Sequence, residues 1–135
     1  RNRTRRRRVA CAVLRAGVAR AVMATGLHPS FGLMHSNRSN PMVLIDDLME
    51  PFRPIIDLTV WQIQRDGHCN VDMDNKKRLI QCLYLDLTTQ YGKTPALICI
   101  QNLATSLAQI YSYERKTLEL PKPGFFTPPA GFTSE

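Results

Sequence analysis

Apolar residues recur at helical spacing from about Val9 to Thr25. They fall at i, i+3, i+4, i+7, i+8, i+11 and i+12, which places them on one face of a helix. The residues of this stripe are Ala10, Val13, Leu14, Gly17, Val18, Ala21 and Val22. Gly26 suits the position just after a helix, and Pro29 prevents the helix from continuing. The sequence therefore predicts a first helix whose small apolar residues let a partner helix approach closely.

A second helical pattern runs from about Val43 to Gln64 and contains two prolines. Its apolar stripe consists of Ile45, Leu48, Met49, Phe52, Ile55, Ile56, Thr59, Val60 and Ile63. Pro51 and Pro54 each remove the N–H that would bond the carbonyl four residues back, on Asp47 and Glu50. We therefore predict that this helix is bent between Asp47 and Pro54.

Two further helices complete the expected fold. Leucines at four-residue spacing predict a helix from Asp74 to Gln90, and Tyr91-Gly92 would end it. Thr94-Pro95 is typical of an N-cap followed by a first helical residue, opening a helix that reaches about Arg115. No strand pattern is evident, so the predicted fold class is all-α with roughly four main helices. The expected divisions are a basic start at 1–8, a helical metal-binding domain at 9–120 and a Pro/Phe tail at 121–135.

The composition fits one globular domain, since 135 residues with 44% apolar content can bury a real core. No uncharged apolar stretch reaches about 18 residues, which argues against a membrane span. The four cysteines form no CxxC pair and are interpreted as reduced, mostly buried thiols. A zinc site is disfavoured because the available spacings match no usual ligand pattern. The side chains considered for it are His28, His35, His68 and Cys69.

Charge is distributed unevenly along the chain. Residues 1–45 contain nine arginines and no acid, whereas residues 46–135 hold nine basic residues against all 11 acids. The two parts therefore carry +9 and −2, which add to the net charge of +7. A segment this basic is typical of contact with nucleic acid, but an acid-free, Arg-rich helix is also typical of a mitochondrial transit peptide. Both interpretations stay open on charge alone.

Three carboxylates cluster beside the two prolines. Asp46 and Asp47 lie four and three residues before Glu50, so on a helix Glu50 shares a face with both. Like charges this close need a cation, and either Arg53 or a divalent metal could supply it. His35 could fold back onto the carboxylates, and one imidazole with carboxylates suits Mn²⁺ or Mg²⁺. The simpler interpretation is a solvated helix face and a loop histidine without a role.

Three short runs carry a resemblance to a known family. They read Gly26-Leu27-His28-Pro29, Gly32-Leu33-Met34-His35 and Asp46-Asp47-Leu48-Met49-Glu50-Pro51-Phe52-Arg53-Pro54. From about Cys11 the chain resembles the C-terminal helical domain of the CRISPR-associated spacer-acquisition endonuclease, the integrase subunit of the adaptation complex. It is most similar to the version found in type II systems. Ala12-Val13-Leu14-Arg15-Ala16 and Leu118-Glu119-Leu120-Pro121 resemble the family's preceding helix and usual ending.

The resemblance implies a set of site residues. His35 and Glu50 match two of the family's three metal ligands, Asp47 matches a further acidic position, and Arg53 matches a basic position beside the site. Arg53 and Arg38 would contact phosphate. The third ligand, an upstream glutamate, has no counterpart because no acid precedes Asp46.

Two other family features also lack a counterpart. One is the β-rich amino-terminal domain. The other is a Leu-Asn-Tyr-Gly-Tyr segment, in whose place stands Arg7-Arg8-Val9-Ala10-Cys11. The start of the chain, residues 1–8, is therefore interpreted as non-native, either a truncation, a frameshifted junction or part of a decayed copy.

The resemblance also implies a function. The family is a Mg²⁺- or Mn²⁺-dependent DNA endonuclease and integrase that inserts spacers into CRISPR arrays in antiviral defence. The implied partners are double-stranded DNA, a second copy of the protein and the small ferredoxin-like adaptation protein, in the cytoplasm of a prokaryote and without a membrane. Whether this chain is itself an enzyme stays open because of the unmatched glutamate. The alternative is a non-catalytic, basic helical domain for DNA binding or protein interaction.

Overall fold

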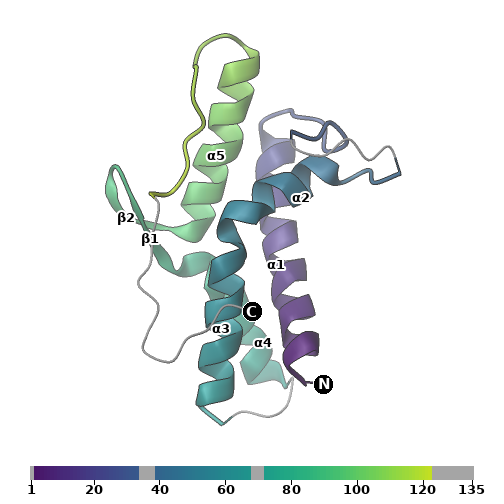
Figure 1. Cartoon of the computed structure of the whole chain (residues 1–135), viewed down its shortest axis with the longest axis vertical. Coiled ribbons are helices and arrows are strands. Elements are labelled where there is room, and N and C mark those ends of the chain that lie inside the picture. The colour runs from purple at the N-terminus through teal and green to yellow at the C-terminus, as the bar shows by residue number, and fades with distance from the viewer. Residues whose placement is uncertain (1, 34–38, 68–71, 123–135) are drawn as a thin grey trace.

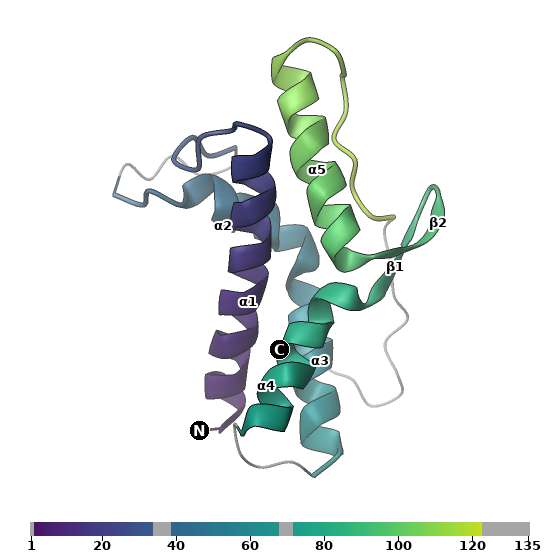
Figure 2. The same cartoon turned by 180° about the vertical axis from the view of Figure 1, so that it is seen from behind.

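The computed structural model describes residues 2–33, 39–67 and 72–122, which are mostly helical with one small two-stranded sheet. The elements, in chain order, are α1 (Asn2–Ala24), α2 (Val43–Met49), the 3₁₀ turn η1 (Glu50–Phe52), α3 (Arg53–Arg65), α4 (Met73–Ile80), the 3₁₀ turn η2 (Gln81–Tyr84), β1 (Asp86–Thr89), β2 (Gly92–Pro95) and α5 (Ala96–Tyr111). The predicted helical fold class is confirmed. Figure 1 shows α1 alongside α3, with α5 extending beyond the upper end of both, and Figure 2 shows α1, α4 and α5 in front of α2 and α3.

Helix α1 is longer than predicted, because it begins within the basic segment at Asn2 rather than near Val9. Arg6 lies one turn before Ala10 on the apolar stripe, and its side chain is only 2% exposed. Arg7 Nε lies 3.0 Å from Asp57 Oδ1 on α3. The basic start therefore continues the first helix and joins the helical packing. Its interpretation as a non-native start stays a prediction.

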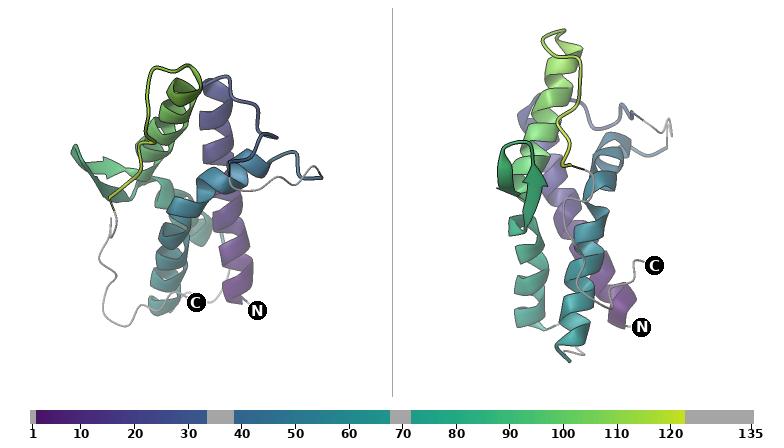
Figure 3. Two further views of the ribbon diagram at one scale, coloured as in Figure 1. Left: turned by 45° about the horizontal axis from the view of Figure 1, so that its top comes forward. Right: turned by 60° about the vertical axis from the view of Figure 1, so that its left-hand side comes forward.

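The second predicted helix is broken where the prolines require it. Pro51 and Pro54 leave the carbonyls of Asp47 and Glu50 without the N–H four residues on. Both carbonyls bond a nearer donor instead: the Glu50 N–H donates to Asp47, and the Arg53 N–H donates to Glu50. These 3₁₀ bonds satisfy both acceptors and turn the chain. The predicted bend is confirmed, and α2 and α3 run in different directions (Figure 3).

The third predicted helix is wrong beyond Ile80. The chain tightens into η2, becomes extended at Leu85 and forms an antiparallel hairpin in which Leu87 pairs with Thr94. Three threonines in the hairpin favour strand, and Gly92 takes a φ of +96° in its turn. The expectation that no strand forms is therefore also wrong. Thr94 belongs to β2 rather than capping a helix.

Helix α5 starts at Ala96 and ends at Tyr111, four residues before the predicted end. Pro95 precedes the helix rather than opening it. Tyr113 has a φ of +60°, and the Glu114 N–H donates back to the Gln109 carbonyl. A left-handed residue with such a bond is a common way to end a helix.

One continuous core joins the helices and the hairpin. α1 contributes most of its predicted stripe, with Val13 only partly buried, and the middle of the core includes Leu14, Phe52 and Leu103, each at most 1% exposed. Cys11, Cys82 and Cys99 are free thiols, and burial raises the pKa of the Cys82 thiol to about 11. Cys82 therefore stays protonated near neutral pH. Its burial as a free thiol agrees with the predicted reduced, mostly buried cysteines.

In the part of the chain that the structure describes, no helix is long and apolar enough to cross a membrane.

Candidate metal centre

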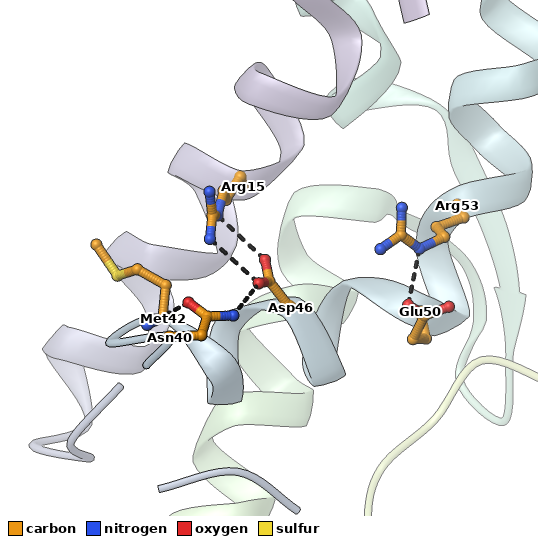
Figure 4. A network of polar contacts seen from close by, with 6 residues as sticks. All are labelled: Arg15, Asn40, Met42, Asp46, Glu50 and Arg53. Carbon is orange, nitrogen blue, oxygen red and sulfur yellow. Dashed lines mark hydrogen bonds and ion pairs between the residues drawn. The ribbon is translucent and has the colours of Figure 1, made fainter. Parts of the chain in front are cut away.

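The carboxylates of the candidate site come from the end of α2 and the break that follows it. Asp46 and Asp47 lie in α2, and Glu50 is the first residue of η1. The proline-induced break thus places Glu50 at the corner between α2 and α3. Figure 4 shows this corner beside the middle of α1.

Asp46 is held by partners from two other segments. Arg15 on α1 approaches it with two nitrogens, Nε at 3.1 Å from Oδ1 and Nη2 at 3.1 Å from Oδ2. The Asn40 side-chain amide also donates to Oδ2, at 2.8 Å, while its carbonyl oxygen accepts the Met42 N–H at 3.0 Å. A two-pronged arginine contact of this kind is directional as well as attractive. Asp46 is therefore committed to protein partners on both oxygens (Figure 4).

Asp47 points inward. Its residue is 7% exposed, and its Oδ2 accepts the Leu33 N–H at 2.8 Å. Leu33 lies two residues before His35 in the sequence. Asp47 thus links the second half of α2 to the connection that contains the predicted histidine ligand.

Glu50 is the carboxylate that faces solvent. Its side chain is 55% exposed, and its Oε1 accepts a bond from Arg53 Nε at 2.9 Å. The Arg53 side chain is itself 39% exposed. An ion pair this accessible contributes only about 0–1 kcal/mol, so it can be exchanged for another partner. Glu50 is therefore the member of the block best able to accept an external cation.

Among the described residues, the three carboxylates contact different groups: Asp46 contacts Arg15 and Asn40, Asp47 accepts from Leu33, and Glu50 pairs with Arg53. Arg53, one of the two cations that spacing allowed, does pair with Glu50. Arg15 was missed as the partner of Asp46, because nothing in helical spacing connects residues 31 positions apart. Among residues 2–33, 39–67 and 72–122, no three acid, histidine or cysteine side chains group as metal ligands would.

His35 and Arg38 lie outside the described residues, so their closeness to Glu50 stays a prediction. Of the zinc ligands considered, His68 and Cys69 also lie outside them. His28 is described, and its Nδ1 lies 2.6 Å from the Ser30 hydroxyl.

Fold and site together define a helical domain with an acidic corner on a proline-broken helix, packed against an arginine-rich helix. Residues 10–90 match the family model described as CRISPR associated protein Cas1. The chain belongs to this family, as the resemblance indicated. The matched span includes all three carboxylates and Arg53.

Two relatives illustrate the similarity. The chain is 34% identical over 114 residues to the CRISPR-associated endonuclease Cas1 of Neisseria meningitidis serogroup C (strain 8013), covering 82% of this chain and 38% of that protein. It is 40% identical over 53 residues to the CRISPR-associated endonuclease Cas1 of Korarchaeum cryptofilum (strain OPF8), covering 39% of this chain and 16% of that protein. The chain thus spans far less than two thirds of either relative.

Proposed function

We propose that this chain supplies part of the divalent-metal site of a Cas1-type DNA endonuclease and integrase, which inserts spacers into CRISPR arrays. One observation carries the proposal: at the proline break, Glu50 is a solvent-facing carboxylate whose partner is a displaceable arginine. The printed name of both relatives, endonuclease, supports the same chemistry.

The proposed ligands are Glu50 and His35, with Asp47 as a possible additional acid and Mg²⁺ or Mn²⁺ as the ion. A carboxylate and an imidazole suit these metals. Asp46 fits poorly because its Oδ2 already accepts bonds from Arg15 and Asn40, and its Oδ1 lies in an ion pair with Arg15. When bound, a divalent ion polarises a phosphodiester and stabilises charge on the attacking or leaving oxygen.

The arginines have separate roles in this proposal. If Glu50 held a metal ion, Arg53 would lose its carboxylate partner, and its guanidinium would be available to a phosphate oxygen. Arg38 is proposed as a second phosphate contact. Such contacts position a nucleic acid without reading its sequence. Double-stranded DNA, a second copy of the protein and the small ferredoxin-like adaptation protein are proposed as partners, on the resemblance alone.

A second function is favoured by the surface of α1. Arg5 and Arg8 are exposed and three residues apart, so they project from neighbouring places on the helix. A non-catalytic, basic DNA-binding domain would use these side chains and would not need Glu50. Specific metal uptake separates the two functions.

We expect Mn²⁺ to broaden nuclear magnetic resonance signals near Glu50 in a saturable way, and Glu50→Ala to abolish that saturation. The physical reason is that the paramagnetic ion must bind at the site to act at low concentration. Glu114→Ala is the matched control, because Glu114 is also exposed but lies beyond α5. It should leave the titration unchanged. If Glu50→Ala and the unaltered chain respond equally, the metal-site function is wrong and the binding-domain function stands.

A further inference from the structure

Helix α2 is only seven residues long, and no side chain caps its amino end. Six of its residues are buried, and Asp46 is the exception. Burial fixes how deeply such a helix sits, whereas apolar attraction itself has no direction. The polar contacts of α2 therefore add the directional restraint on where the residues at its end point.

Asp46 makes the directional contact between α2 and α1. The two nitrogens of Arg15 approach the two oxygens of Asp46, and Asn40 adds a third bond from the segment that leads into α2. A single exposed ion pair contributes little to stability. A contact through two arginine nitrogens, within a network of hydrogen bonds, also fixes the relative orientation of the two side chains. Figure 4 shows the three side chains meeting at the face of α2 next to α1.

Glu50 lies four residues after Asp46, so it is one helical turn further along the same face. The chain between them is helical up to Met49 and continues into η1 without an extended residue. A rotation of α2 about its axis would therefore carry Glu50 with it. Fixing Asp46 fixes the direction in which Glu50 leaves the corner.

We propose that Arg15, Asp46 and Asn40 form a positioning bracket, in which Asp46 is not a metal ligand but an anchor that aims Glu50 at the ion. The inference rests on the proposed function in one respect, that Glu50 is the ligand being aimed. It assigns roles to Arg15 and Asn40 that no spacing pattern indicated.

The bracket and the rival role of Asp46 as a metal ligand predict opposite effects of Arg15→Met on Mn²⁺ affinity. If Asp46 bound the ion, removing the positive charge of Arg15 would strengthen cation binding, because like charges repel. If Asp46 is an anchor, Arg15→Met frees α2 and weakens Mn²⁺ binding. We expect a loss of roughly 10-fold, which is typical of losing a group that orients a metal ligand.

The matched control is Arg7→Met, since Arg7 pairs with Asp57 at 3.0 Å across α1 and α3, away from α2. It removes the same charge from the same helix and should leave Mn²⁺ affinity within about twofold, because it touches no ligand-orienting group. An equal loss in both variants would show a general effect of charge or stability and would overturn the bracket.

Reversing the pair gives a second test. Combining Arg15→Asp with Asp46→Arg restores the ion pair with its direction exchanged, and we expect it to recover part of the Mn²⁺ affinity that Arg15→Asp alone loses. A ligand role for Asp46 predicts the reverse, a further loss on adding the second substitution. That result would overturn the proposal.

Amide hydrogen exchange tests the bracket without metal. The Glu50 N–H donates to the Asp47 carbonyl at the break, so its exchange reports how firmly the end of α2 is held. Arg15→Met should speed exchange at Glu50 while leaving the α5 amides unchanged. Unchanged protection at Glu50 would overturn the bracket even if no metal binds. Faster exchange at Glu50, with Mn²⁺ binding indifferent to Glu50→Ala, would keep the bracket and reject the metal-site function.

Discussion

Replacing Phe52 with alanine should lower the free energy of unfolding by about 3–5 kcal/mol, the usual cost of truncating a buried phenylalanine. Phe52 is fully buried at the last position of η1, where the chain turns from α2 into α3. Its ring belongs to the same core as residues of α1 and α5. The substitution removes apolar burial and leaves a cavity that two helices meeting at a fixed corner cannot easily close. Urea denaturation followed by circular dichroism measures the change.

Phe31→Ala is the control for this prediction. Phe31 is 72% exposed in the connection between α1 and α2, and its ring makes an edge contact with His28. Truncating it should change stability by no more than about 0.5 kcal/mol. Similar effects of the two substitutions would mean that the corner is not packed as the structure indicates.

The sequence predicted the features that depend on residues within one or two helical turns of each other. The 3.6-residue spacing predicted the residues of the α1 stripe that are buried in the structure. The two N–H groups that Pro51 and Pro54 lack predicted the break in the second helix. The error lies at Leu87, which the four-residue spacing of Leu79 and Leu83 assigned to a helix. A single apolar residue can be buried equally well from a strand, and Leu87 is 1% exposed in β1. Over so short a segment, the spacing of leucines alone cannot distinguish a helix from a strand.

The candidate site was predictable only in part, because partners across helices leave no periodic signal. The block around Glu50 and its pairing with Arg53 could be found within one turn of chain. The contacts of Asp46 with Arg15, and of Asp47 with the Leu33 N–H, depend on how α1 and the following connection fold back. Helical spacing showed three similar carboxylates. In the structure they differ: Asp46 pairs with Arg15, Asp47 is buried and accepts the Leu33 N–H, and Glu50 is exposed.

Duplex DNA binding by this chain should weaken steeply with salt. Arg5 and Arg8 present charge on the outer surface of α1, and each phosphate contact contributes about −0.9 to the slope of log affinity against log salt. Replacing both with glutamine should reduce that slope by roughly two. Lys116 and Lys122, exposed beyond α5, give a control of equal charge loss when replaced in the same way. An equal change in both double variants would mean that net charge, rather than α1, determines binding.

The same chain should bind DNA without cutting or joining it. The two proposed ligands, Glu50 and His35, would hold an ion loosely, and residues 1–45 contain no acid that could add a third. Asp46 could replace the unmatched glutamate only by giving up Arg15 and Asn40, and Asp47 is 7% exposed with its Oδ2 already accepting the Leu33 N–H. We therefore expect that neither acid takes over the full role of the unmatched glutamate.

The assay incubates the purified chain with Mn²⁺ and branched DNA beside Glu50→Ala. We expect no cleavage or joining by either protein, since losing a ligand removes the positioning and charge stabilisation on which metal-assisted phosphoryl transfer depends. Activity that vanishes in Glu50→Ala would show that the acids present suffice, whether through Asp46 or Asp47, and would contradict this prediction. Equal faint activity in both would indicate a contaminating nuclease, because a reaction that ignores Glu50 does not use this site.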